Sequence, residues 1–295
     1  MYKLALVGGE SIRQYTVADK LWQILGERTQ ESFQFEVIPL KDENEAKQFF
    51  QNFINDDSFR GFNIALPWKS LFAGMVDEVI TGDQLPIINT VYKSGKRVLG
   101  DNTDPLGVVA SIRLRHDMNE FKRCLILGAG GAGTATAHYL SSQFKIAIYI
   151  FDTAAPSLGN VDGINVLSGL EELSTHKYDL IVNATPRGKY YLATSINNFE
   201  SPLDRDLLRK VSLPHTVVQE MNYMPRETLL LQLAESLQLE TIPGEAMLVA
   251  QALESMQRYF GRPTSRDLAT YATDAIATHI KQQESAILKL KQGAS

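Results

Sequence analysis

One stretch constrains the fold of this chain more than any other, the run Cys124-Leu-Ile-Leu-Gly-Ala-Gly-Gly-Ala-Gly133. Its first four apolar residues predict a buried parallel strand, and the segment 134–140 after it has the composition of a helix. In such a unit Gly128 forms the tight turn, Gly130 permits a close backbone approach, and Gly133 brings helix and strand together. A helix N-terminus presents N–H groups that can hold a pyrophosphate. The residues predicted to do so are Gly130, Gly131, Ala132 and Gly133.

An acidic residue follows at the expected distance. The next predicted strand, 146–151, runs into Asp152, which lies 19 residues beyond Gly133. A carboxylate at this position typically accepts hydrogen bonds from a ribose 2′-hydroxyl. Together these features predict a site for a nicotinamide-type dinucleotide. The alternative is an α/β core in which the glycines only turn the chain.

Size and composition narrow the class of protein. A chain of 295 residues is long for one core and favours two domains. The net charge of −5 is mild and the basic residues are dispersed, which argues against nucleic acid as a partner. No apolar run approaches a membrane span, and the N-terminus enters a predicted strand without a signal-peptide pattern. We therefore expect a cytoplasmic protein with no membrane partner.

The cysteine and histidine residues indicate neither a disulfide nor a metal site. The single cysteine, Cys124, excludes an internal disulfide and is expected to be a core residue of the predicted strand. The five histidines show no spacing typical of metal ligands, so no metal site is predicted.

Strand and helix patterns alternate along both halves of the chain. In the first half the predicted strands are 2–7, 33–40, 61–67 and a hairpin of 90–92 with 97–99; the helices are 17–26, 43–53 and 104–115. In the second half the predicted strands are 124–127, 146–151, 164–167, 178–183 and 216–221; the later helices are 228–237, 244–260 and 265–290.

This alternation predicts an α/β fold with an N-terminal α/β substrate domain and a Rossmann dinucleotide-binding domain. The expected boundaries are 1–104 for the substrate domain, with the helices of 251–295 returning to it, and 105–250 for the Rossmann domain. Ligands of such sheets collect at the carboxyl ends of strands, so the active site is expected in a cleft between the domains. The polar last helix packs on the outside of a domain or against a second subunit, which leaves a monomer or a homodimer open.

Six short motifs occur in a fixed order around the glycine run. Before it come Asn63-Ile-Ala-Leu-Pro-Trp-Lys69, Ile88-Asn-Thr90 and Gly100-Asp-Asn-Thr-Asp104. After it come Asn183-Ala-Thr185 with Gly188, Tyr223-x-Pro225 and Gly244-x-x-Met-Leu-Val-x-Gln251. In order and spacing the chain resembles the shikimate/quinate dehydrogenase family over nearly its whole length.

The resemblance implies a catalytic pair, which the chemistry also favours. Oxidation of a secondary alcohol needs a base near the hydroxyl, and a partly buried lysine favours the neutral amine that can accept a proton. By resemblance, Lys69 is this acid/base and Asp104 bonds the same hydroxyl and holds the lysine. The alternatives are a solvated lysine at Lys69 and a helix N-cap at Asp104.

The resemblance also implies binding residues. Asn89 and Gln251 match ligands of substrate hydroxyls, and Tyr223 matches a tyrosine near the substrate and the nicotinamide. Residues expected to line the cofactor on its nicotinamide side are Asn183, Thr185, Gly188, Gly244 and Met247. Taken singly, a core methionine, a buried tyrosine and a surface glutamine are equally good interpretations of three of these positions.

The chain departs from the family at the predicted cofactor site. Family members that use NADP usually carry Asn-Arg-Thr after the second Rossmann strand, and the arginine meets the 2′-phosphate. Here the matching residues are Phe151-Asp-Thr153, so an anion replaces the cation. A carboxylate repels a phosphate but accepts hydrogen bonds from a diol. We therefore predict NAD in preference to NADP, with the alternative that Asp152 only caps a turn.

A second departure affects the predicted substrate site. The family binds the ring carboxylate with two hydroxyl residues in a glycine-led loop, which here reads Gly8-Gly-Glu-Ser-Ile-Arg-Gln-Tyr-Thr-Val17. The pair becomes Gln14 and Thr16, or Tyr15 and Val17, depending on a one-residue shift. Arg13 could clamp a carboxylate and Tyr15 could donate a hydrogen bond, or Arg13 is a solvated loop charge.

These features predict an oxidoreductase that transfers a hydride between NAD and a ring hydroxyl of a shikimate- or quinate-like hydroxy acid. The partner is a small molecule, with an aminated or otherwise modified ring acid as a further possibility. The alternative function is a non-catalytic dinucleotide-binding or sensor protein on the same fold. A retained lysine–aspartate pair argues against that alternative, since a binder needs no base beside a nicotinamide.

Overall fold

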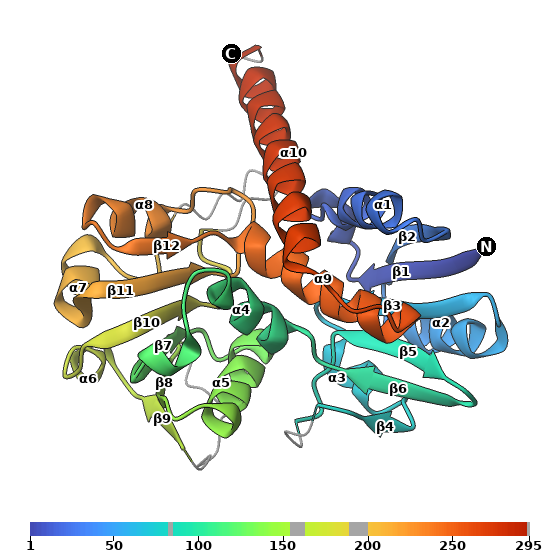
Figure 1. Ribbon diagram of the computed structural model, residues 1–295, viewed down its shortest axis with the longest axis horizontal. Coiled ribbons are helices and arrows are strands. Elements are labelled where there is room, and N and C mark those ends of the chain that lie inside the picture. The colour runs from blue at the N-terminus through green and yellow to red at the C-terminus, as the bar shows by residue number, and fades with distance from the viewer. Residues whose placement is uncertain (82–84, 154–162, 189–199, 294–295) are drawn as a thin grey trace. The chain divides into compact units, whose positions relative to one another are not determined.

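In the computed structural model of the protein, residues 1–81, 85–153, 163–188 and 200–293 are described. The chain divides into two compact units (Figure 1). The first comprises residues 1–103 and 251–279, and the second comprises 104–250 and 280–295. This division differs from the predicted domains at Asp104 and in the last helix, whose residues from Ile280 onward join the second unit. The assignment of the units to substrate and cofactor stays a prediction.

The first unit is built on a mixed sheet of six described strands in the order β2-β1-β3-β5-β6-β4. Strands β1 (Tyr2–Gly8), β2 (Phe33–Pro39) and β3 (Phe59–Ile64) run parallel. Strands β5 (Thr90–Ser94) and β6 (Arg97–Asp101) form the predicted hairpin, and β4 (Glu78–Val79) pairs with β6. The hairpin turns at Gly95, whose φ of 62° lies in the left-handed region that glycine adopts without strain.

Helices bury both faces of this sheet. Helix α2 (Glu43–Asn55) starts at Asp42, whose carboxylate caps two backbone N–H groups, and it buries Phe50 and Phe53. The short helices η1 (Ile12–Gln14) and α3 (Lys69–Ala73) follow strands of the unit. Helix α1 (Ala18–Thr29) stacks Trp22 on Phe35, with 5.5 Å between the ring centroids. The predicted strand 61–67 ends earlier, at Ile64, because the Trp68 N–H donates to Ala65 O and turns the chain.

The second unit contains a fully parallel sheet of six described strands in the order β12-β11-β10-β7-β8-β9 (Figure 1). Counted along the chain, this is the order of a doubly wound dinucleotide-binding sheet. The strands are β7 (Arg123–Leu127), β8 (Ala147–Phe151), β9 (Ile164–Leu167), β10 (Tyr178–Asn183), β11 (Ser212–Glu220) and β12 (Glu240–Ile242). Every residue of β10 is buried, as expected for a central strand covered on both faces.

Two sets of helices cover this sheet. Helices α4 (Asp104–Arg113) and α5 (Gly131–Gln143) contribute Ile112, Ala137 and Leu140 to a core on one face. Helices α6 (Leu170–Leu173), α7 (Arg205–Val211) and α8 (Leu229–Ser236) contribute to the core on the other face. The short helix η2 (Met118–Glu120) precedes β7. Right-handed crossovers between parallel strands produce such two-sided cover.

The two last helices are α9 (Gly244–Phe260) and α10 (Arg266–Gly293), and each changes unit along its length. In the first unit, α9 packs close to β3 through Tyr259. A Cβ atom added at Gly61 of β3 would lie 2.3 Å from the Tyr259 ring, so only glycine permits this approach. None of the helices in the described part of the chain has an apolar stretch that would cross a bilayer.

Candidate active site

The carboxyl ends of the central strands of the second unit form the first part of the candidate site. Strands β7 and β10 are neighbours here, and the strand order reverses between them. Leu127 at the end of β7 is in register with Phe151 and with Asn183, which is in turn in register with Glu220. Ligands of doubly wound sheets bind in the crevice at such a reversal point.

The glycine run makes the turn that the sequence predicts. Gly128 has φ of 100°, and its N–H donates to Phe151 O at 2.7 Å. A Cβ atom at Gly133 would lie 2.0 Å from Gly128 O, so helix α5 can approach the turn only with glycine there. Gly130, the N-cap of α5, has open space at its Cβ position.

The first turn of α5 fits an anionic group. Its N–H groups have no acceptor within the helix, as at every helix N-terminus, and Gly131 and Ala132 are half-buried there. The open space at Gly130 leaves room for a pyrophosphate beside them. These residues are therefore suited to hold a dinucleotide.

Asp152 lies at the glycine turn. It follows the last residue of β8, and its carboxylate oxygen Oδ2 accepts the Ala129 N–H at 2.7 Å. The hydrogen bond thus holds an acidic side chain against the loop of the glycine run. The contact of Asp152 with a ribose stays a prediction.

The residues predicted to lie on the nicotinamide side begin at the last residue of β10, and Asn183 and Thr185 are hydrogen-bonded to each other. Asn183, fully buried, accepts the Thr185 N–H at 3.0 Å and the Thr185 hydroxyl at 2.7 Å on its Oδ1. The Thr185 hydroxyl in turn accepts the Arg187 N–H at 3.2 Å. Gly188 ends this turn with φ of 88°, a conformation that favours glycine.

Glu220, a residue that the sequence analysis does not single out, lies beside Asn183. Its side chain is 0% exposed, and both carboxylate oxygens accept the Asn183 side-chain amide at 3.0 Å. Burial raises the pKa of Glu220 to about 7, while the hydrogen bonds it accepts lower it. The only sequence signal was its place near the end of the predicted strand 216–221.

The start of α9 approaches the segment after β11 very closely. A Cβ atom at Gly244 would lie 2.0 Å from Asn222 O, so glycine is required at this position. Met247 is 5% exposed and is part of the hydrophobic core, and Tyr223 is half-buried. Glu245, which follows Gly244, is buried, and its Oε1 lies 2.5 Å from Arg226 Nε.

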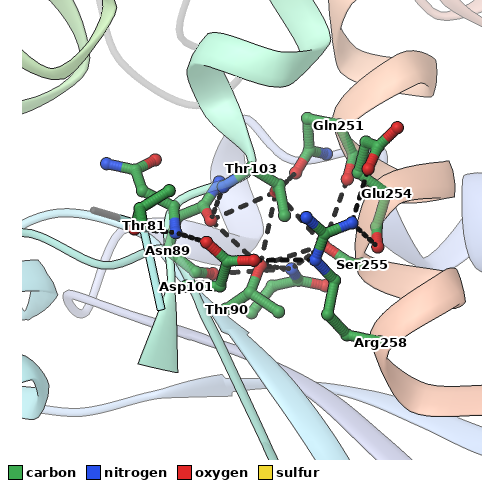
Figure 2. Close-up of polar contacts among 11 residues, drawn as sticks. Thr81, Asn89, Thr90, Asp101, Thr103, Gln251, Glu254, Ser255 and Arg258 are labelled. Carbon is green, nitrogen blue, oxygen red and sulfur yellow. Dashed lines mark hydrogen bonds and ion pairs between the residues drawn. The ribbon is translucent and has the colours of Figure 1, made fainter. Parts of the chain in front are cut away.

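In the first unit, a buried polar network surrounds Asn89 (Figure 2). Its Oδ1 accepts the Thr103 N–H at 2.7 Å and the Thr90 hydroxyl at 2.9 Å. The Thr103 hydroxyl donates to Gln251 Oε1 at 3.3 Å, so two predicted substrate ligands share one neighbour. Asn63 of β3 donates to Ser255 of α9 at 2.9 Å and ties that helix to the sheet. The predicted residues Asn89 and Gln251 are therefore brought together within one unit.

A charged cluster flanks this network. Arg258 Nε lies 2.7 Å from Asp101 Oδ2, and Arg258 Nη1 lies 2.5 Å from Glu254 Oε2. Asp101 is only 2% exposed, and its Oδ1 accepts the N–H of Asn102 at 2.8 Å. Figure 2 shows Arg258 of α9 reaching the end of β6. The ion pair fixes the start of the Asn-Thr-Asp turn that leads to Asp104.

Replacing Arg258 with methionine should lower the free energy of unfolding by about 3 kcal/mol, because Asp101 would be left buried without its cation. Denaturant unfolding followed by tryptophan fluorescence measures this, since both tryptophans, Trp22 and Trp68, lie in the first unit. The control is Arg97→Met, which removes the exposed Arg97–Glu78 pair. It should cost less than about 1 kcal/mol. Equal losses in the two variants would contradict the prediction.

Lys69 and Asp104 belong to different units, and their pairing stays a prediction. Lys69 is the first residue of α3, half-buried, and its backbone carbonyl accepts the Ile88 N–H at 3.4 Å. Asp104 is the first residue of α4 and is 8% exposed. The backbone hydrogen bond ties Lys69 to Ile88, the residue before Asn89.

The glycine-led loop of the first unit contains the short helix η1. Arg13 is exposed and lies 3.9 Å from Glu36, while Tyr15 and Thr16 are half-buried. The Thr16 hydroxyl accepts the Ala18 N–H at 3.2 Å at the start of α1, and Val17 is fully buried. Contact of Arg13, Tyr15 or Thr16 with a carboxylate stays a prediction.

Comparison with known proteins places the chain in a family. No protein-family model matches it. A shikimate dehydrogenase (NADP(+)) of Caldicellulosiruptor saccharolyticus is 33% identical, over 76% of this chain and 80% of the relative. One of Thermosynechococcus vestitus is 31% identical, over 74% of this chain and 77% of the relative. The chain belongs to the shikimate dehydrogenase family.

Solved structures share the fold of this shikimate dehydrogenase family member. A chorismate mutase/shikimate 5-dehydrogenase fusion protein from Clostridium acetobutylicum has a TM-score of 0.82 at 22% identity, covering 95% of this chain and 99% of the other. The shikimate 5-dehydrogenase of Thermus thermophilus, in complex with NADP(H) and shikimate, has a TM-score of 0.77 at 22% identity, covering 93% and 99%. That of Listeria monocytogenes, in complex with shikimate and NAD, has 0.77 at 20%, covering 94% and 96%. The predicted fold class, including the Rossmann unit, is confirmed.

Proposed function

We propose that this shikimate dehydrogenase family member transfers a hydride between a nicotinamide cofactor and a ring hydroxyl of a shikimate- or quinate-like hydroxy acid. The observation that carries this is its membership of a family whose curated relatives are named shikimate dehydrogenase. The glycine turn at the reversal point of the parallel sheet supports it as a place for the dinucleotide. A non-catalytic dinucleotide sensor is not favoured.

We propose that Lys69 of the first unit and Asp104, the first residue of the second unit, act on the alcohol as a pair. Lys69 accepts the hydroxyl proton in the oxidation and returns it in the reduction, and Asp104 orients the lysine. Asn89 and Gln251 bind ring hydroxyls, and their shared neighbour Thr103 supports this by restricting both side chains. A bound nicotinamide would supply the hydride acceptor.

The second unit supplies the cofactor site. We infer that the first turn of α5 holds the pyrophosphate and that Asp152 accepts hydrogen bonds from the ribose diol. Asn183, Thr185, Tyr223, Gly244 and Met247 are proposed to line the nicotinamide side. The Ala129 N–H to Asp152 hydrogen bond supports a carboxylate beside the nucleotide.

Asp152 is expected to make NAD the preferred cofactor, although the curated relatives carry NADP(+) in their names. Its charge would repel a 2′-phosphate, so kcat/KM with NAD should exceed that with NADP about tenfold or more. The variant Asp152→Asn keeps an oxygen for the Ala129 N–H and removes the charge. It should therefore lower the ratio of kcat/KM with NAD to kcat/KM with NADP. Steady-state kinetics with both cofactors measures the ratio; equal or better use of NADP by the wild type would contradict the preference.

The altered glycine-led loop leaves the acid end of the substrate to other groups. We propose Arg13 and Tyr15, with Thr16, as the carboxylate-binding side chains, because they lie in the loop that follows β1. The wild-type protein should be tested with a panel of shikimate, quinate and aminated ring acids, with each cofactor, by nicotinamide absorbance. Reduction of the cofactor by one of these acids supports the function, and no turnover on any of them would contradict it.

We propose a cytoplasmic enzyme that acts on a small molecule, as a monomer or a homodimer, with neither nucleic acid nor membrane as a partner. In the described part of the chain no three histidine, cysteine, aspartate or glutamate side chains gather into a possible metal site.

A further inference from the structure

Glu220 is an unusual buried charge. It is the last residue of β11 and is 0% exposed, in register with Asn183 of β10. Buried carboxylates generally pair with a cation, but no lysine, arginine or histidine of the described residues forms an ion pair with Glu220. Its charge is balanced by hydrogen bonds instead.

All the hydrogen-bond partners of Glu220 are donors. The Asn183 amide donates to both oxygens at 3.0 Å, and the Thr228 hydroxyl donates to Oε2 at 2.9 Å. On Oε1 the carboxylate also accepts the N–H of Met221 at 3.0 Å, the N–H of Asn222 at 2.9 Å and the Asn222 side-chain amide at 3.0 Å. Such a shell suits a carboxylate and not an amide, which would turn N–H groups toward other donors.

The carboxylate fixes the orientation of two asparagine amides. Because the Asn183 Nδ2 faces Glu220, its Oδ1 is turned to Thr185, where it accepts the backbone N–H and the hydroxyl. The Asn222 Nδ2 also donates to Thr185 O at 2.9 Å and to Arg187 O at 3.2 Å. One buried side chain therefore joins the turn after β10 to the segment after β11.

We propose that Glu220 is a positioning residue for the cofactor site, holding the turn 184–188 and the segment 221–225 in the arrangement that receives the nicotinamide end. This rests on the proposed function, which places Thr185 and Tyr223 beside the nicotinamide. Glu220 acts through Asn183 and Asn222 and touches neither substrate nor cofactor. Removing a group that orients binding side chains commonly weakens binding, about 10- to 100-fold for the partners of metal ligands.

The charge of Glu220 gives the proposal a pH signature. Burial raises its pKa to about 7. Below that pH the carboxyl carries a proton, and its O–H meets only donors, so one of the hydrogen bonds must break. The charged side chains of the adjoining segments have other partners or face solvent: Arg187 lies 3.9 Å from Glu200, Arg226 pairs with Glu245, and Glu227 is exposed. Cofactor affinity should therefore fall as the pH drops through 7.

The test compares Glu220→Gln with Asp179→Asn in the full chain. Asp179 is a matched control because it is also a buried carboxylate of the same sheet, 7% exposed, that accepts backbone N–H groups. It lies near the start of β10, whereas Asn183 ends that strand. The readouts are the Kd for NADH, from nicotinamide fluorescence at pH 6 and pH 8, and the thermal unfolding curve.

The expected result is a Kd for NADH raised about tenfold or more in Glu220→Gln and unchanged in Asp179→Asn, with both variants destabilised. The wild-type Kd should be about tenfold higher at pH 6 than at pH 8, and this dependence should vanish in Glu220→Gln. A folded Glu220→Gln with a Kd within twofold of the wild type would overturn the proposal, as would a wild-type Kd that does not change with pH.

If Glu220→Gln does not fold, Thr228→Val takes its place, because it removes one donor to Glu220 with little change of volume; it also removes the acceptor of the Leu231 N–H at the start of α8. It should raise the Kd for NADH several-fold, and an unchanged Kd would overturn the proposal. A wild-type protein that binds no NADH would overturn the cofactor site itself and the positioning role with it. Wild-type binding together with unaffected variants would overturn the positioning role alone.

Discussion

Replacing Lys69 with alanine should lower kcat about 10²- to 10⁴-fold, the range that general acid–base groups contribute. Without the amine, no side chain at the start of α3 can accept the hydroxyl proton. The loss should fall on kcat, because Lys69 acts on the reacting hydroxyl and the proposed cofactor residues lie in the second unit. Turnover of the best acid from the substrate panel, together with the Kd for NADH, separates the two effects.

The matched control is Lys96→Ala, which removes an exposed lysine of the same unit from the β5–β6 turn. It should keep wild-type turnover. Alanine at position 69 is compatible with the first turn of a helix, so the variant should fold and bind NADH as the wild type does. A Lys69→Ala protein that retains more than a tenth of wild-type kcat would exclude Lys69 as the acid/base.

The second large effect is expected at the glycine turn. Gly133→Ala should lower the free energy of unfolding by about 4 kcal/mol or more, because the new Cβ atom would lie 2.0 Å from the carbonyl oxygen of Gly128. Backbone cannot move aside as a flexible side chain can, so α5 would have to shift away from the sheet. Thermal unfolding followed by circular dichroism measures this, and a melting curve like that of the wild type would contradict the packing argument.

Gly130→Ala separates folding from binding at the same turn. No atom lies within 4 Å of the Cβ position at Gly130, and its φ of −72° suits any residue. The variant should therefore melt like the wild type. If the pyrophosphate approaches Gly130, the added methyl group should still raise the Kd for NADH. A Kd equal to that of the wild type would place the cofactor elsewhere.

Much of the fold follows from local patterns. The strand bounds at Ile164–Leu167 and Tyr178–Asn183 and the helix Gly244–Phe260 are as predicted, because their apolar periodicity has clear breaks at both ends. The predicted strand 216–221 instead extends from Ser212 to Glu220. Pairing with β10 and β12 supports residues of β11 that its own composition does not single out.

The candidate site also contains contacts that the sequence does not predict. Asp101 and Arg258 are far apart in the chain, and no motif connects them, yet they form the ion pair beside the Asn89 network. The importance of Glu220 likewise depends on which strand lies next to β11. Both are contacts between distant segments, which local patterns do not encode.

By itself, the sequence determined the glycine turn, the acid after the second strand of the Rossmann unit and the order of the motifs, because these depend on residue type and short spacing. The tertiary structure alone decided which buried polar groups face one another. Whether a buried charge is tolerated depends on the donors or cations that distant strands and helices bring to it, as at Glu220 and Asp101. Which donors or cations surround a buried charge is therefore decided by the packing of the sheet and its helices.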